Sequence, residues 1–324
     1  MNSSCVQINF DFTGRFLPPV YILVFIVGLT ANLIGLKFLL QNWTKLFVIN
    51  VFVLNLALAD VLYLLMLPFR VVYHLKSSEW IFGDSFCKVT RFCFNMNLYG
   101  SIGFLTCIGV SRYLAIVHPV RVMGQLTTIH SVVISVLVWV LVSVQSLPDM
   151  FFPKTSANRN QSCFDTTSSE FVEDYLTYSL GWTVTGFCLP FLIIMGCYTH
   201  VIVTLFCSSS TNRCKRLRLL MVMLLLFSVC YIPYHIFKNL NLWVRVLTKN
   251  KQCYSWFNTV YVGHQVGRGL VSLNSALNPL VYLHVSEELS SGFRALIGRT
   301  RRVLYSNKMS FTTGDTSSHV TDQV

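Results

Sequence analysis

Long apolar segments alternate with short polar ones along almost the whole chain. A helix needs about 20 apolar residues to cross the hydrocarbon core of a bilayer. Seven segments reach about that length: Phe16–Leu40, Leu46–Val72, Phe86–Val117, Ile129–Leu147, Leu176–Phe206, Leu217–Leu242 and Val260–Leu283. Several contain proline, which membrane helices tolerate because neighbouring groups satisfy the freed backbone. The pattern predicts an all-α fold, a bundle of seven transmembrane helices.

Basic residues gather on one side of the predicted membrane. The connection 207–218 holds Arg213, Lys215, Arg216 and Arg218 and no acid. The loops of the other side carry the acidic residues Glu79, Asp84, Asp149, Asp165, Glu170, Glu173 and Asp174. By the positive-inside rule the basic side is cytoplasmic, which puts the amino terminus outside the cell and the carboxyl terminus inside.

This orientation predicts four regions. They are an extracellular amino terminus (1–15), the seven-helix domain (16–285), a short amphipathic eighth helix (286–305) and a disordered cytoplasmic tail (306–324). The tail is rich in Ser and Thr, which suits a kinase substrate. Two sequons, at Asn2 and Asn160, lie on the predicted outer side and are expected to be glycosylated. A third, at Asn42, falls on the inner side and is not.

The composition agrees with a chain that lies mostly in lipid. It is 53% hydrophobic and 12% charged, whereas soluble domains carry roughly 25% charged residues. The net charge of +12 comes from short loops rather than from one continuous face, which argues against a nucleic-acid polymer as a partner. The first expected partner is the lipid bilayer, and the expected location is the cell membrane, with several crossings.

Three basic residues fall inside the outer portions of predicted spans: Arg91, Lys238 and Arg268. Each buried charge costs on the order of 2.5–3.5 kcal/mol on insertion scales, so membrane helices keep such residues when they are paired or functional. Asp60 is the one acid expected within the membrane, and it lies about 15 Å along its helix from Arg70. It cannot neutralise the three cations, and an anionic ligand is therefore expected.

Other readings of the basic residues stay open. Arg70 and Lys88 stand near span ends and are expected to extend to the membrane interface. Arg245 could pair with Glu170, and Arg268 with Asp165, in a resting state. Such a bridge is compatible with a ligand anion that takes the same cation in the bound state.

Helical spacing brings candidate ligand groups onto common faces. His235 and Lys238 are three residues apart, and Gln265, Arg268 and Ser272 follow the same rule on the last span. On the third span the corresponding series is Arg91, Asn95 and Tyr99. The hypothesis is that the cations hold anionic groups, while the aromatic rings of Tyr99, Tyr261 and Phe94 flank the rest of the ligand.

A set of landmarks occurs in order along the seven segments. They are Asn32, Asp60 at the end of Leu-Ala-Leu-Ala-Asp, Cys87, Ser111-Arg112-Tyr113, Trp139, Pro190, Tyr198, Cys-Tyr-Ile-Pro ending at Pro233, and Asn278-Pro279-Leu280-Val281-Tyr282. Together they resemble the rhodopsin-like (class A) G-protein-coupled receptors. This family has the seven-helix fold and no enzymatic activity. Phe94 stands where the amine receptors of the family have Asp, so a cationic amine is not the expected ligand.

A finer resemblance is carried by shorter motifs. They include Trp-Ile-Phe-Gly-Asp at 80–84, Asn-Leu-Tyr-Gly-Ser at 97–101, His235-x-x-Lys238 and Gln265-x-x-Arg268. These motifs resemble the metabotropic purinergic nucleotide receptors, closest to their ADP-activated type-one branch. Asn95 and His264 depart from the residues common in that branch. The resemblance implies a nucleotide ligand, with ADP favoured, and adds Asp165, Asn241, Arg245, Tyr261 and His264 to the expected ligand-binding residues.

The resemblance also implies structural and signalling features. Disulfides are expected between Cys87 and Cys163 and between Cys5 and Cys253. An allosteric sodium ion is expected at Asp60, Ser101, Asn274, Ser275 and Asn278, whose oxygens suit a hard cation. The activation switch is expected at Arg112, Tyr113, Tyr198, Phe227, Tyr231, Pro233, Asn278, Pro279 and Tyr282.

The expected partners on the inner side are a heterotrimeric G protein, arrestin and a receptor kinase. A Gq-type protein acting through phospholipase C and calcium release is favoured over inhibition of adenylyl cyclase.

Two other functions remain as alternatives. The first is a receptor of the same fold for another small anion, a dicarboxylate or an anionic lipid. The second is an organic-anion transporter or channel. No metal-spaced set of His and Cys and no pair of nucleophile and base is found, so an enzyme is not expected.

Overall fold

The computed structural model describes residues 11–41, 48–76, 78–118, 127–153, 163, 167–207 and 213–285, except for the side chains of 205–220 and 280–285. The predicted amphipathic helix, the tail and the two sequons lie outside these residues. Two compact units divide the chain, Met1–Pro279 and Leu280–Val324. The helices of the bundle belong to the first unit, and of the second unit the structure describes residues 280–285.

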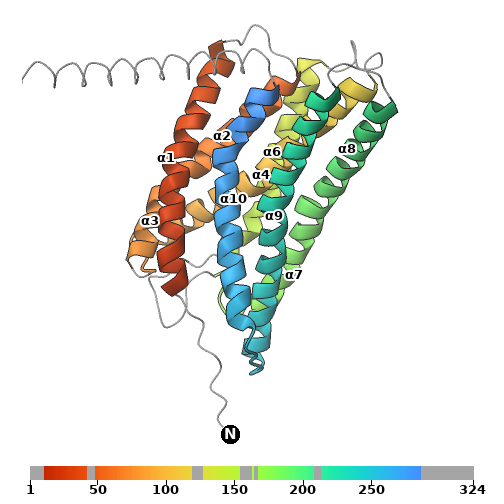
Figure 1. The fold of residues 1–324 in the computed structure, drawn as a ribbon. Coiled ribbons are helices and arrows are strands. Elements are labelled where there is room, and N and C mark those ends of the chain that lie inside the picture. The colour runs from red at the N-terminus through yellow and green to blue at the C-terminus, as the bar shows by residue number, and fades with distance from the viewer. Residues whose placement is uncertain are drawn as a thin grey trace, which may run out of the picture. The chain divides into compact units, whose positions relative to one another are not determined.

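Ordered segments of the described residues are helical throughout, which confirms the all-α prediction. The helices are α1 (Asp11–Gln41), α2 (Val48–Leu64), α3 (Leu67–Leu75), α4 (Asp84–Val117), α6 (Thr128–Phe151), α7 (Val172–Thr183), the π-helical turn η2 (Val184–Cys188), α8 (Leu189–Cys207), α9 (Arg213–Lys249) and α10 (Phe257–Val285). Figure 1 shows the longer helices as roughly aligned rods, with α4 passing behind α10 and α9.

Six helical stretches of the described chain are long and apolar enough to cross a membrane, with mean hydropathy between 1.5 and 2.2. Large apolar side chains such as Leu23, Val133 and Leu192 point outward from them, as expected where lipid is the solvent. α10 matches the seventh predicted span but carries Gln265, Arg268 and Asn274 within it, and it does not belong to this apolar set. These three polar residues are buried inside the bundle.

The second predicted span is interrupted. α2 ends at Leu64, a short turn follows, and α3 begins at Leu67 with Pro68 in its first turn. Proline fits there because the first helical N–H groups have no partner in the helix. After the turn, α3 packs against α1 and turns one face inward, made of Leu67, Arg70, Tyr73 and His74.

The fifth span contains the π-helical turn η2, immediately before Pro190. Such turns insert one residue into a helix and are frequent at functional sites. A Cβ on Gly186 would lie 2.7 Å from the Trp182 ring and 2.8 Å from the Tyr99 ring. These two rings stack at 4.1 Å. Glycine at 186 therefore lets η2 approach the stacked pair that joins α7 to α4.

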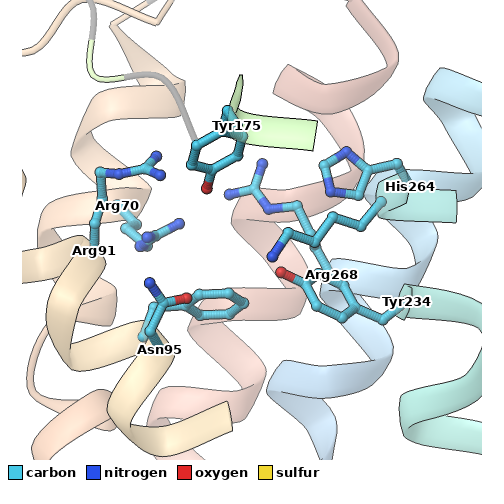
Figure 2. A pocket seen from close by; sticks show the side chains of 9 residues that line it. Arg70, Arg91, Asn95, Tyr175, Tyr234, His264 and Arg268 are labelled. Carbon is cyan, nitrogen blue, oxygen red and sulfur yellow. The ribbon is translucent and has the colours of Figure 1, made fainter. Parts of the chain in front are cut away.

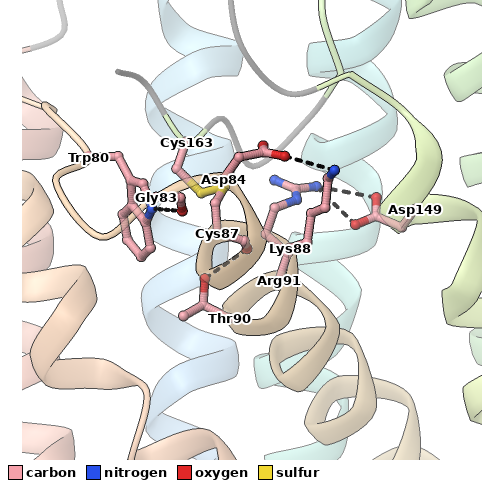
Figure 3. The surroundings of a disulfide bond; sticks show 9 residues. All are labelled: Trp80, Gly83, Asp84, Cys87, Lys88, Thr90, Arg91, Asp149 and Cys163. Atoms are coloured by element: carbon pink, nitrogen blue, oxygen red, sulfur yellow. Dashed lines mark hydrogen bonds and ion pairs between the residues drawn. A yellow bond between two sulfur atoms is a disulfide. The ribbon is translucent and has the colours of Figure 1, made fainter. Parts of the chain in front are cut away.

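The amino-terminal end of α4 is fixed by a disulfide and an aromatic cluster. Cys87 and Cys163 are bonded, with their Cα atoms 5.8 Å apart, which confirms the first predicted pairing. Figure 3 shows the bond beside Trp80, whose indole N–H donates to the carbonyl oxygen of Gly83 at 2.7 Å. Cys253 is also disulfide-bonded, while its predicted partner Cys5 lies outside the described residues.

Candidate ligand-binding site

A pocket opens between α3, α4, α7, α9 and α10. Its cavity volume is about 10 Å³, room for about one water molecule, so the lining side chains nearly fill it in this arrangement and must move apart to admit a ligand. Figure 2 shows side chains reaching into it from two sides. They belong to Arg70, Arg91, Phe94, Asn95, Tyr175, Tyr234, Lys238, His264 and Arg268. Four of these nine are cations.

Arg91 is held by a carboxylate inside the bundle. Its Nη2 atom lies 3.2 Å from both oxygens of Asp149, and the hydroxyl of Tyr175 donates to the same carboxylate at 2.6 Å. The expectation that Asp149 lies in an outer loop was wrong. α6 continues through Pro148 to Phe151, so Asp149 is a buried membrane acid in addition to Asp60, with 1% of its surface exposed. Figure 3 shows this ion pair next to the disulfide.

Lys238 and His235 lie on one buried face of α9, as their spacing predicts. The Lys238 ammonium is 5.9 Å from the centre of the Tyr234 ring. The His235 ring stacks on Phe187 at 4.4 Å, and neither of its nitrogens bonds to any part of the chain that the structure describes. The lysine faces the pocket, whereas the histidine lies one turn deeper.

Arg268 is oriented by two neutral partners. Its Nη1 donates to Gln265 Oε1 at 2.9 Å and its Nη2 to the Tyr21 hydroxyl at 3.2 Å. Ser272 donates to the carbonyl oxygen of Arg268 at 2.9 Å and shares a second bond with Tyr63. Hydrogen bonds along the predicted face of α10 therefore orient the guanidinium toward the pocket.

Arg70 corrects another expectation. Instead of extending to the membrane interface, it is buried with 6% of its surface exposed. Its guanidinium carbon lies 5.2 Å from the centre of the Phe94 ring. Lys88, by contrast, behaves as expected for an interface residue: its side chain is 41% exposed and pairs with Asp84 at 2.7 Å. The two residues were grouped together from the sequence, and the structure separates them.

Several of the predicted ligand residues that the structure describes do not line this pocket. Tyr99 is deeper, stacked on Trp182. Tyr261 shares a hydrogen bond of 2.7 Å with Thr13 of α1. Arg245 donates to the carbonyl oxygen of Thr167 at 2.7 Å. Asn241 is buried on α9, and Asp165 lies outside the described residues.

A polar core lies deeper in the bundle, where sodium was expected. Asp60 accepts from the amides of Asn97 and Asn278, each at 2.8 Å. Ser275 donates to Asn97 at 3.1 Å, and Asn274 to the Tyr231 hydroxyl at 2.6 Å. One carboxylate with amide and hydroxyl oxygens around it is a donor set that suits a hard monovalent cation. Asn97, which the sequence reading did not include, joins the predicted Ser101 and the others in this core.

The predicted switch residues differ in how deeply they are buried. Tyr198, Phe227 and Tyr231 are buried, and the rings of Phe227 and Tyr231 lie 4.9 Å apart. Tyr113 bonds to His200 at 3.2 Å. Arg112 and Pro233 are half-buried, and Asn278 and Pro279 are buried. The side chain of Tyr282 is not among those described.

Sequence reasoning missed the lining residues Arg70, Tyr175 and Tyr234. It also missed Asp149 and Tyr21, which bond to the lining residues Arg91 and Arg268. One signal was available for Arg70. It shares a helical face with Leu67 and His74, three residues before and four after, which a lipid-facing or interface arginine need not do. For Asp149 the proline before it suggested a helix end that the fold does not have.

Comparison with known proteins extends the match beyond these motifs. The family described as 7 transmembrane receptor (rhodopsin family) matches residues 31–282. The metabotropic purinoceptor 1 of Meleagris gallopavo is 40% identical over 309 residues, which cover 93% of this chain and 83% of the relative. The same purinoceptor of Homo sapiens is 39% identical over 306 residues, covering 92% and 80%. The 2-oxoglutarate receptor 1 of Rattus norvegicus is 37% identical over 297 residues, covering 90% and 86%.

These matches cover the described helices almost from end to end, and the family is one of receptors rather than of enzymes. They favour the receptor over the transporter or channel considered from the sequence. The chain therefore belongs to the rhodopsin family of G-protein-coupled receptors, multi-pass membrane proteins, and within it to the branch of metabotropic purinoceptor 1.

Proposed function

We propose that the chain is a receptor for an extracellular nucleotide, with ADP as the favoured agonist. The observation that carries the proposal is the convergence of Arg70, Arg91, Lys238 and Arg268, from four different helices, on one pocket. Asp149 is a carboxylate bonded to this cluster through Arg91, and it brings one negative charge to a site with four positive ones. A ligand with phosphate groups would supply further negative charge through charge-assisted hydrogen bonds, each contributing about 1.5–3 kcal/mol.

The proposal also includes the orientation of the chain and the partners on each side of the membrane. The amino terminus is extracellular and the carboxyl terminus cytoplasmic, so the pocket opens to the outside. The inner side engages a heterotrimeric G protein of the Gq type, and phospholipase C and calcium release carry the signal. Arrestin and a receptor kinase act on the tail, and a sodium ion occupies the polar core around Asp60. Agonist acts by binding one arrangement of the helices more tightly than the other.

Calcium imaging of cells that express the chain tests this proposal directly. A panel of ADP, ATP, UDP and UTP should raise cytosolic calcium with ADP at the lowest concentration. Lys238→Gln and Arg268→Gln should each raise the half-maximal concentration by at least about tenfold, the equivalent of about 1.4 kcal/mol. Lys88→Gln, an exposed cation outside the pocket, is the matched control and should respond as the wild type does. Silence toward all nucleotides at normal surface expression would reject the nucleotide.

A second candidate is a receptor for a short dicarboxylate. The lining side chains leave little free space in the pocket, which favours a compact ligand, and one relative at 37% identity is named 2-oxoglutarate receptor 1. Arginine binds carboxylate and phosphate with the same planar geometry, so the cations alone do not separate the two ligands. Adding 2-oxoglutarate to the panel separates them: a response to it without a response to ADP selects this candidate.

A further inference from the structure

Arg70 reaches the pocket because of a local feature of the backbone. The turn at Leu65 and Met66 ends α2, and α3 starts again with Pro68 in its first turn. The backbone amide of Met66 bonds to the carbonyl oxygen of Tyr63, a tighter i−3 step, at 2.9 Å. The helix that follows turns Arg70 and His74 toward the interior. The centres of the His74 and Tyr21 rings lie 6.0 Å apart, and Tyr21 is the residue that orients Arg268.

The surroundings of Arg70 are those of a binding group rather than of a membrane anchor. The guanidinium packs over the ring of Phe94, which lines the pocket together with its neighbour in the sequence, Asn95. In Figure 2 Arg70 and Arg91 enter the pocket from one side, and Arg268 enters from the other. A planar guanidinium can form two parallel hydrogen bonds with one carboxylate or phosphate. The pocket therefore offers such forks on two opposite walls, with the Lys238 ammonium as a further cation.

Opposite walls of this kind suit a ligand with two anionic groups. Arg91 shares its charge with Asp149 at 3.2 Å, and on the opposite wall Arg268 bonds to Gln265 and Tyr21. Four cations close together also repel one another, and one anionic group can contact only part of the set. A second anionic group placed toward α3 would lower that repulsion at Arg70.

We infer that Arg70 is a specificity-determining residue of this pocket, which binds the second anionic group of a ligand that carries two. The inference rests on the proposed function and deepens it, because it selects diphosphates over monophosphates, or dicarboxylates over monocarboxylates. The shared chemistry is a compact anion with two separated negative groups.

Thermal unfolding of the purified full-length receptor tests the inference with two matched ligand pairs. The phosphate pair is ADP and AMP, and the carboxylate pair is 2-oxoglutarate and 2-oxobutyrate. A ligand that binds the folded state raises the unfolding temperature by mass action. For the wild type, the ligand with two anionic groups should act at a lower concentration than its partner, and the pair that responds identifies the source of the anion.

Arg70→Gln should raise the half-maximal concentration of the two-group ligand by about tenfold or more, the loss of one charge-assisted interaction. It should change that of the one-group ligand less than about threefold, a difference of about 0.6 kcal/mol. Arg70→Lys keeps the charge and should recover part of the preference, and Lys88→Gln should match the wild type. Unfolding without ligand reports separately on any loss of stability in Arg70→Gln.

Three results would overturn the inference. Equal loss for both members of a pair means that Arg70 acts only on the shape of the pocket. An unchanged preference in Arg70→Gln means that the second anionic group lies elsewhere. If no ligand of either pair stabilises the wild type, the proposed function fails, and the inference fails with it. The first two results leave the proposed function intact, so the two failures are distinguishable.

Discussion

At the scale of single residues, Arg91 and Asp149 form a buried ion pair inside the bundle, 3.2 Å apart. Tyr175 adds a donor to the carboxylate at 2.6 Å. The same carboxylate competes with any ligand anion for Arg91. We therefore expect Asp149 to stabilise the folded pocket and to lower the affinity for an anionic ligand.

A double-mutant cycle measures the strength of this pair. Asp149→Asn keeps the size of the side chain and an acceptor for Tyr175 but removes the charge, and it should lower the unfolding temperature, because removing one partner of a buried ion pair costs about 3–5 kcal/mol. Arg91→Gln should have a similar effect. The double variant should be less destabilised than the sum of the two. Additive losses would mean that the pair contributes no interaction energy.

A second prediction concerns ligand competition at the same residue. In Asp149→Asn the Arg91 guanidinium has lost its carboxylate, so an anionic ligand no longer displaces one. The rise in unfolding temperature at saturating ADP should be larger in Asp149→Asn than in the wild type, although the variant starts from a lower temperature. The measurement uses both proteins at the same ligand concentrations, with Lys88→Gln as the control. An equal or smaller rise would show that Asp149 helps to bind the ligand instead of competing with it.

At the scale of helices, the departures from regular geometry are what shape the pocket. The break between α2 and α3 turns Arg70 inward. The turn η2 brings Gly186 against Trp182 and Tyr99 below the pocket. On the other side Gly267 lets α10 approach α9, because a Cβ there would lie 2.8 Å from the Tyr234 backbone.

Alanine substitutions at Gly186 and Gly181 distinguish the effect of side-chain crowding from the effect of helix propensity in the fifth span. In Gly186→Ala the new methyl group would meet two aromatic rings below 3.0 Å, and overpacking of this kind costs about 1–3 kcal/mol. In Gly181→Ala nothing lies within 4 Å of the new methyl group. That control should be neutral or stabilising by up to about 1 kcal/mol, because alanine favours the helix. Thermal unfolding of both variants is the measurement, and equal effects would contradict the close approach at η2.

The helices themselves were predictable because hydropathy along the chain reports directly on burial in lipid. Every predicted span corresponds to a helical stretch of the structure. What the sequence could not give is the effect of each proline. Pro68 starts a new helix, whereas α6 runs through Pro148 for another turn. The difference depends on neighbouring groups that satisfy the freed backbone, and these become known only with the tertiary structure.

The same reason limits prediction of the site. Lys238 and Arg268 could be identified because a basic residue inside an apolar run needs an explanation. Arg70 stands near the end of its span, where the interface is also within reach, and its direction follows from the break at Leu65. Asp149 was assigned to a loop because it follows a proline at the end of an apolar run. Both errors concern residues at the ends of helices, where pattern is least informative.

At the scale of the whole receptor, a pocket at one side of the bundle must be connected to the switch residues at the other. The polar core is placed between them: Asp60 of α2, Asn97 of α4 and Asn278 of α10 are bonded directly to one another through the carboxylate. A group shared by three helices changes its bonding when any of them moves. A bound cation that adds to this core would favour one arrangement of the helices over another.

This gives a prediction about sodium that uses stability and does not depend on the agonist. If sodium binds at Asp60, raising its concentration to tenfold above its dissociation constant should stabilise the folded receptor by about 1.4 kcal/mol relative to choline at equal ionic strength. Asp60→Asn should abolish the sodium-dependent part, because a neutral amide cannot supply the negative charge. Ser146→Ala, a buried serine on α6 outside this core, should keep it. The core links α2, α4 and α10, so Asp60→Asn should also change the agonist concentration needed for signalling. An equal response to sodium in the wild type and in Asp60→Asn would remove the cation from this core.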